Sequence, residues 1–139
     1  MKPPERVVRE LALEWLAKAD VDLSAGRALL SAADLFEVVA FHSQQAVEKS
    51  LKAFLAWHQV EFPKTHDIRR LLALCASIDS DLAETLAAAA AAELTPYGVA
   101  YRYPGEYPPV SKEAAEASLA TAHTVLVEVA KHLPGKPGR

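Results

Sequence analysis

The chain has 139 residues, 51% hydrophobic and 24% charged, which is the size and balance of one globular domain. Its formal net charge of −3 excludes a global positive field that would attract DNA or an anionic membrane, so nucleic acid could bind only at a local patch. One cysteine, Cys75, excludes an internal disulfide, and its leucine-rich surroundings predict a buried thiol. We find no signal peptide and no apolar run of membrane-spanning length, and therefore expect a cytoplasmic protein without membrane contact.

The first predicted helix covers residues 5–30, where apolar residues recur at three- and four-residue spacing. Gly26 weakens this helix locally and would allow close contact with a neighbouring helix. Asp20 lies beside the apolar pattern, either at the core margin or as a solvated carboxylate, and the solvated position is the commoner one. A polar break follows, in which Asp34 is placed to cap the next helix.

The central predicted helix runs from Asp34 to His58 and is the longest helical pattern in the chain. Two apolar strips predict that it is covered on two sides, with Leu51 and Phe54 in the core. The polar residues between the strips form one flank, the first candidate for function: His42, Gln45, Lys49 and Lys52. Alternatively, part of this set is only an ion pair on a solvated face, since Glu48 precedes Lys52 by four residues, and we expect Lys49 to be exposed.

Two shorter helices are predicted next. Thr65 is placed to cap a helix that runs to Ile78, with Asp67 in its first turn. His66 and Asp67 put an imidazole and a carboxylate beside that helix N-terminus, which makes them candidate site residues, although capping alone explains the pattern. A further alanine-rich helix is predicted over residues 82–94, and the Thr-Pro pair that follows should end it.

All four tyrosines lie in residues 97–110, around Arg102. This segment is either a ligand-binding loop or a set of tyrosines that closes the end of a bundle. Ser111 then caps a last helix that reaches Leu133, and residues 134–139 should be a disordered tail. The sequence therefore predicts an all-α protein, an up-and-down antiparallel bundle of four to five helices that forms one domain over residues 1–133.

The histidines and the cysteine do not indicate a metal site. No H-x3-H, H-E-x-x-H or C-x2-C pair occurs, so no metal and no cofactor is expected. His58 lies on the apolar face of the central helix and should be a packed side chain.

One stretch is similar to a known family. Residues 41–72 read FHSQQAVEKSLKAFLAWHQVEFPKTHDIRRLL. This resembles the HEPN family of small prokaryotic helical domains, in which H-x-x-Q-x-A-E-K-x-L-K-A is followed by Thr or Ser, His, and Asp or Asn. The resemblance extends to the segment from Tyr97 to Pro104 and to residues of the first helix: Trp15, Ala19, Asp20, Leu23 and Ala28.

The resemblance implies a homodimer and a role as a ribonuclease, a toxin–antitoxin component or a nucleotide-binding module, often beside a minimal nucleotidyltransferase. Catalytic members carry an arginine, four to six further residues and then a histidine, and two copies form one RNA-cleaving cleft. Counting from Arg102, those positions hold Tyr107, Pro108 and Pro109. A tyrosine normally titrates near pH 10, so the group that would move a proton at neutral pH is absent.

Three functions therefore stay open. The first is a nucleotide- or RNA-binding dimer that partners a nucleotidyltransferase in a toxin–antitoxin-like pair. The second is a metal-independent ribonuclease that uses His66 or His42, and the third is a non-catalytic dimeric scaffold. The candidate ligand-binding residues are His42, Gln45, Lys49, Lys52, His66, Asp67, Tyr97, Arg102 and Tyr103.

Overall fold

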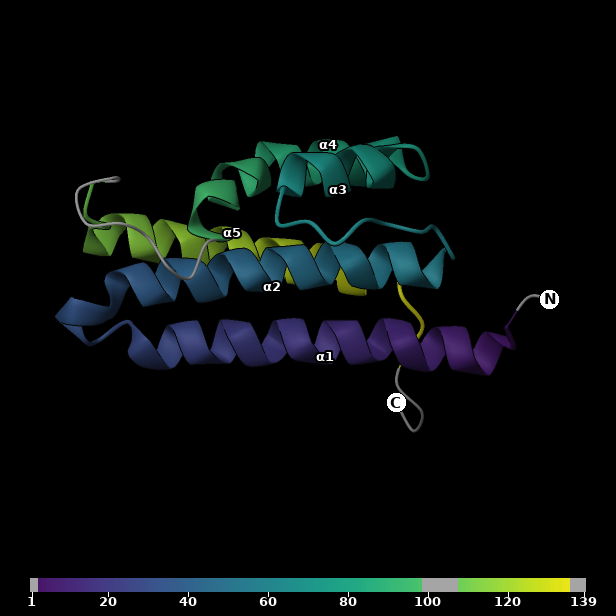
Figure 1. Cartoon of the computed structure of the whole chain (residues 1–139), viewed down its shortest axis with the longest axis horizontal. Helices are drawn as coiled ribbons and strands as arrows, with labels where there is room; N and C mark the ends of the chain where they lie inside the picture. The colour runs from purple at the N-terminus through teal and green to yellow at the C-terminus, as the bar shows by residue number, and fades with distance from the viewer. Residues whose placement is uncertain (1–2, 99–107, 136–139) are drawn as a thin grey trace.

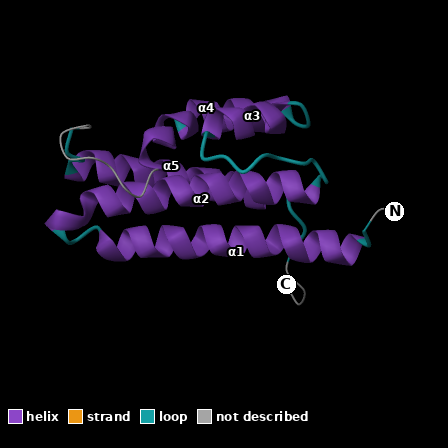
Figure 2. Cartoon of the chain, in the orientation of Figure 1, coloured by secondary structure: helices purple, strands orange, loops and turns teal. Residues whose placement is uncertain are grey.

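The computed structural model describes residues 3–98 and 108–135, and in this part of the chain helices joined by loops are the only regular secondary structure, without a strand (Figures 1 and 2). Its elements, in chain order, are α1 (Glu5–Leu29), the 3-10 helix η1 (Ala33–Leu35), α2 (Phe36–Trp57), α3 (Ile68–Ala76), α4 (Ser80–Ala88), the 3-10 helix η2 (Ala91–Gly98) and α5 (Lys112–Ala130). The predicted all-α bundle is confirmed. No helix among the described residues has the length and apolarity needed to cross a membrane.

α2 occupies the centre of the bundle. It contacts α1 on one side and α5, α3 and η2 on the others. α1 runs antiparallel to α2, whereas α5 runs in the same direction as α2, because the connector between α2 and α3 (residues 58–67) and then α4 each carry the chain back (Figure 1). The organising role predicted for the central helix is thus confirmed by its contacts with α1, α5, α3 and η2.

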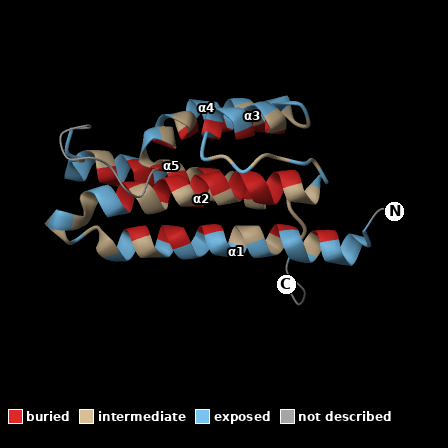
Figure 3. Ribbon diagram, viewed as in Figure 1, coloured by how far each residue is buried: buried red, intermediate tan, exposed pale blue. Residues whose placement is uncertain are grey.

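The core forms along the apolar strips of α2. Leu51 and Phe54 are buried as predicted, and the small residues Ala46 and Ala53 are buried on the second strip. Figure 3 shows α2 buried over most of its length, whereas α1 has one buried and one exposed face. Polar groups on so enclosed a helix need partners within the protein, since an unpaired buried polar group is costly.

α1 and α5 approach each other closely at Gly26. A Cβ atom added to Gly26 would lie 2.8 Å from Leu119 Cδ2, so the leucine would have to move. The close helix contact predicted for this glycine is confirmed.

The start of α2 differs from the prediction. Asp34 is exposed within η1, and the residue that precedes α2 is Leu35, which has no side-chain cap. The chain enters α2 directly from the 3-10 turn, so Asp34 never occupies the capping position.

The caps of the later helices are partly as predicted. Asp67, not Thr65, caps α3, because its side chain accepts from Arg69 N at 3.0 Å. Thr65 Oγ1 accepts from Asp67 N at 3.0 Å, in the loop before the helix. The Ser111 cap of α5 is confirmed by its bond of 3.0 Å from Ala114 N.

The fourth helix is shorter than predicted. α4 begins at Ser80 after the Asp79 cap and ends at Ala88. Ala90 then takes a φ of 66°, a left-handed conformation that stops an α-helix, and the chain continues as η2 with Pro96 inside it. The prediction of one helix over residues 82–94 is therefore wrong at both ends.

Several predictions concern residues 99–107 and 136–139, which lie outside the described residues. They include Arg102, Tyr103 and most of the tail. The domain limits 1–133 stay a prediction.

Candidate functional site

Polar side chains of α2 line the seam where this helix meets α1 and the connector between α2 and α3. This polar strip consists of His42, Gln44, Gln45, Glu48, Lys49 and Lys52. Two acidic anchors hold it, Asp22 of α1 at one end and Glu48 of α2 itself at the other. The four residues of the predicted polar flank all belong to the strip.

At the first anchor, one carboxylate bridges two basic side chains. Asp22 Oδ1 lies 2.9 Å from His42 Nδ1, and Asp22 Oδ2 accepts from Lys49 Nζ at 2.6 Å. The Asp22 side chain is only 11% exposed and that of Lys49 is 24% exposed. The expectation of an exposed Lys49 is thus wrong, because the ion pair draws its amino group into the α1–α2 seam.

The second anchor is Glu48, whose side chain is 4% exposed. Its Oε1 lies 2.7 Å from His66 Nδ1, and its Oε2 accepts from Lys52 Nζ at 3.0 Å. Gln44 Nε2 donates to the same Oε1 over a longer distance of 3.4 Å. A buried carboxylate thus has three donors, which compensate the cost of burying its charge.

The Glu48–Lys52 pair exists, but it is not on a solvated face. The Lys52 side chain is 9% exposed, and its Nζ lies 5.5 Å from the centre of the Trp15 ring and 5.8 Å from that of Phe62. One ring comes from α1 and the other from the connector, so the pair is covered by residues distant in sequence. Such cation–π contacts strengthen when they are shielded from water.

Gln44 joins three segments of the chain. It is fully buried, its Nε2 donates to the His66 carbonyl at 3.1 Å, and its Oε1 accepts from Gln45 Nε2 at 2.8 Å. The last residue of η2, Gly98, packs directly on it, since a Cβ there would lie 2.9 Å from Gln44 Cδ. Arg102 follows Gly98 by four residues in the sequence.

His66 is the most accessible polar side chain of this cluster. Its side chain is 65% exposed, whereas the Glu48 carboxylate that holds its Nδ1 is buried. Among the described residues, no partner bonds His66 Nε2. The structure thus presents an imidazole that is fixed on one side and open to solvent on the other, an arrangement suited to phosphate binding or to proton transfer.

The described part of the chain includes two further candidates, Asp67 and Tyr97. Asp67 caps α3, and Tyr97 is half-buried in η2, where it packs against the core. Arg102 and Tyr103 lie outside the described residues.

His58 lies at the far end of α2. Its ring is exposed on one side and lies tilted against Phe54 on the other, with ring centres 4.5 Å apart, so the predicted packing is only partial. Desolvation lowers the pKa of His58, as does the neighbouring His132, while Asp79 opposes the shift.

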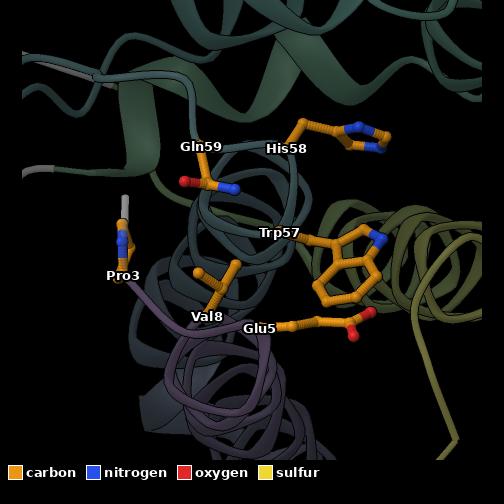
Figure 4. A pocket seen from close by; sticks show the side chains of 6 residues that line it. All are labelled: Pro3, Glu5, Val8, Trp57, His58 and Gln59. Carbon is orange, nitrogen blue, oxygen red and sulfur yellow. The ribbon is translucent and has the colours of Figure 1, made fainter. Parts of the chain in front are cut away.

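A separate hollow adjoins His58 where α1 begins and α2 ends (Figure 4). None of the site candidates within the described residues lines it. Its lining residues are Pro3, Glu5, Val8, Trp57, His58 and Gln59. No group of three or more His, Cys, Asp or Glu side chains within the described ranges is placed to hold a metal ion.

Two carboxylates that anchor the strip, Asp22 and Glu48, are not among the predicted site residues. The spacing of Asp22 could have indicated its position, because it lies three residues after Ala19 and four before Gly26, both of which are buried on the inner face of α1. Asp20 is exposed, which confirms the solvated position that the sequence favoured for it.

Comparison with known proteins identifies the family. The sequence profile of the HEPN domain matches residues 12–133. The chain belongs to the HEPN family. No curated protein matches it at a significant level.

Two solved structures support the HEPN fold. TT1696 from Thermus thermophilus is 31% identical, with a TM-score of 0.68 over 88% of this chain and 98% of that one. ST0689, an archaeal HEPN homologue, is 24% identical, with a TM-score of 0.67 over 88% of this chain and 98% of that one.

Proposed function

We propose that this HEPN protein binds a nucleotide or RNA through phosphate contacts at the polar strip. The observation that carries the proposal is the exposed His66 imidazole, which buried Glu48 holds by one nitrogen. When protonated, such an imidazole donates a charge-assisted hydrogen bond to a phosphate oxygen. The fixed orientation reduces the entropy that binding would otherwise cost.

Other candidate residues extend this contact. Lys49 and His42 are partly exposed at the Asp22 end of the strip, so they can meet a second phosphate. In the proposal, Arg102 and Tyr103 add a guanidinium–phosphate contact and base stacking, because the chain leaves η2 at Gly98, beside Gln44.

The proposed biological unit is a homodimer that partners a minimal nucleotidyltransferase in a toxin–antitoxin-like pair, in the cytoplasm, where nucleotides and RNA are available. HEPN membership supports this assignment, since members of the family often dimerise.

Binding of labelled single-stranded RNA and of nucleotides tests the proposal. His66→Ala should weaken RNA binding about tenfold, the effect of losing one charge-assisted contact, and added salt should weaken wild-type binding. His123→Ala is a matched control, because His123 is an exposed histidine on α5 that contacts Arg27, away from the strip. Equal affinity of wild type and His66→Ala would refute the assignment of the site.

One observation favours a second function, a metal-independent ribonuclease. Glu48 orients His66 as the carboxylate of a catalytic triad orients its histidine, so Nε2 could remove the proton of a 2′-hydroxyl group. RNA cleavage measured with a metal chelator decides between the two functions. Robust wild-type cleavage that His66→Ala abolishes would establish the ribonuclease, whereas neither binding nor cleavage, with or without a nucleotidyltransferase, would favour the scaffold.

A further inference from the structure

The outer face of α1 carries apolar residues that no described element covers (Figure 3). Val7 is 42% exposed, Leu11 48% and Val21 68%, and these are three of the five large hydrophobic side chains exposed in the described part of the chain. At 100° per residue, they fall within about 80° of one another around the helix. Exposed apolar residues that share one face often mark a protein contact.

Charged residues of opposite sign occupy the middle of the same face. This α1 stripe consists of Val7, Leu11, Glu14, Lys18, Val21 and Ala25. The spacing alternates between four and three residues, which is the seam of a coiled coil. All of these side chains are exposed or half-buried, and none is buried.

The α1 stripe is complementary to itself when it is reversed. If two copies of α1 pair antiparallel about a point midway between Glu14 and Lys18, Glu14 of each copy faces Lys18 of the other. The same register places Leu11 opposite Val21 and Val7 opposite Ala25. A parallel pairing would instead set glutamate against glutamate and lysine against lysine, which costs stability.

We propose that the α1 stripe binds the α1 stripe of a second copy of this chain, antiparallel and about a two-fold axis. The proposal specifies the contact of the homodimer put forward above and rests on it. Because a two-fold contact uses the same patch twice, each favourable pair occurs twice.

The surface beside the stripe has the shape that this packing requires. Leu11, Glu14, Trp15 and Lys18 line a small hollow, and their spacing of i, i+3, i+4 and i+7 is that of the hole that receives a side chain in a coiled coil. A second, mostly apolar hollow extends from Leu11 and Trp15 to Phe62 of the connector. The contact is therefore wider than a single helix edge.

Charge reversal measured by analytical ultracentrifugation tests the pairing. Glu14→Lys alone sets lysine against Lys18 twice, and Lys18→Glu alone sets glutamate against Glu14 twice, so each should raise the dimer dissociation constant about tenfold. The double variant Glu14→Lys/Lys18→Glu should dimerise as the wild type does, and an equimolar mixture of the two single variants should form heterodimers. Unchanged dimerisation in both single variants would overturn the α1 pairing while leaving the homodimer intact.

Engineered disulfides check the register. A mixture of Leu11→Cys and Val21→Cys chains should form covalent dimers on mild oxidation. Leu11→Cys alone should not, since its two copies would lie about 15 Å apart along the helix axis, too far for a disulfide. Cys75 is buried and should not interfere. Efficient cross-linking of Leu11→Cys alone would refute the register, and a monomeric wild type at micromolar concentration would refute both the pairing and the homodimer.

Discussion

Removal of the Glu48 carboxylate by Glu48→Ala tests how the polar strip is held together. The change leaves the Lys52 ammonium group, 9% exposed, without its anionic partner, and it frees the buried Gln44 amide from one acceptor. Breaking one side of a buried ion pair costs about 3–5 kcal/mol, because the remaining charge stays desolvated. We therefore expect the free energy of unfolding to fall by about that amount.

A surface pair of the same spacing provides the control. Arg6 and Glu10 are also four residues apart, with a separation of 3.4 Å, but their side chains are 76% and 65% exposed. Glu10→Ala should cost no more than about 0.5 kcal/mol, since water screens exposed pairs. The assay is urea denaturation of both variants and the wild type at one protein concentration.

A double-mutant cycle isolates the pair itself. Lys52→Ala alone leaves Glu48 with His66 and Gln44, so it should cost less than Glu48→Ala. The double variant should cost less than the sum of the two single changes. Equal costs for Glu48→Ala and Glu10→Ala would refute the argument that Glu48 anchors a buried charge.

Three further predictions concern a core leucine and two titratable side chains, Cys75 and His58. Leu51→Ala should lower the free energy of unfolding by about 2–5 kcal/mol in urea denaturation, because Leu51 is fully buried and the change leaves a cavity. Burial raises the pKa of Cys75 from 9.0 to about 12, so the free energy of unfolding should fall as pH rises above 9, where only the unfolded chain loses the thiol proton. The folded thiol should also resist Ellman's reagent until the chain unfolds. The pKa of His58 is lowered in the folded chain, so the unfolded chain binds a proton at this histidine at a higher pH, and stability should fall as pH drops through 6.5. His58→Gln should reduce that fall, and an unchanged pH profile would contradict the lowered pKa of His58.

The arrangement of the helices was predictable because it rests on periodicity. The strips of α2 predicted a helix covered on two sides, and Leu51 and Phe54 are buried there. The end of α4 was not predictable, since alanines favour a continuing helix and only the left-handed Ala90 interrupts it.

The polar strip was predictable only in part. Four of its basic and amide residues follow from spacing along one helix. The depth of the Glu48–Lys52 pair does not, because Trp15 and Phe62, which cover Lys52, come from other segments. Spacing along one helix cannot show whether an i,i+4 pair is surface-exposed or buried beneath a neighbouring element.

The α1 pairing and the polar strip are connected by geometry, and this leads to a last prediction. Asp22, which holds one end of the polar strip, directly follows Val21 of the α1 stripe and lies about 100° further around α1. The two surfaces are therefore adjacent. A two-fold axis perpendicular to both helices keeps the same flank of each α1 on one face of the pair, with the two Asp22 residues about 18 Å apart along the helix axis.

Both polar strips would then open on the same face, where one RNA strand could contact both copies. Glu14→Lys should therefore weaken the binding of a long single-stranded RNA more than that of a mononucleotide, because only the long ligand gains from two linked sites. The added positive charge would by itself favour RNA, so weaker binding cannot arise from electrostatics alone. Restored RNA binding in Glu14→Lys/Lys18→Glu would complete the argument, whereas equal loss for both ligands would show that the strips act separately.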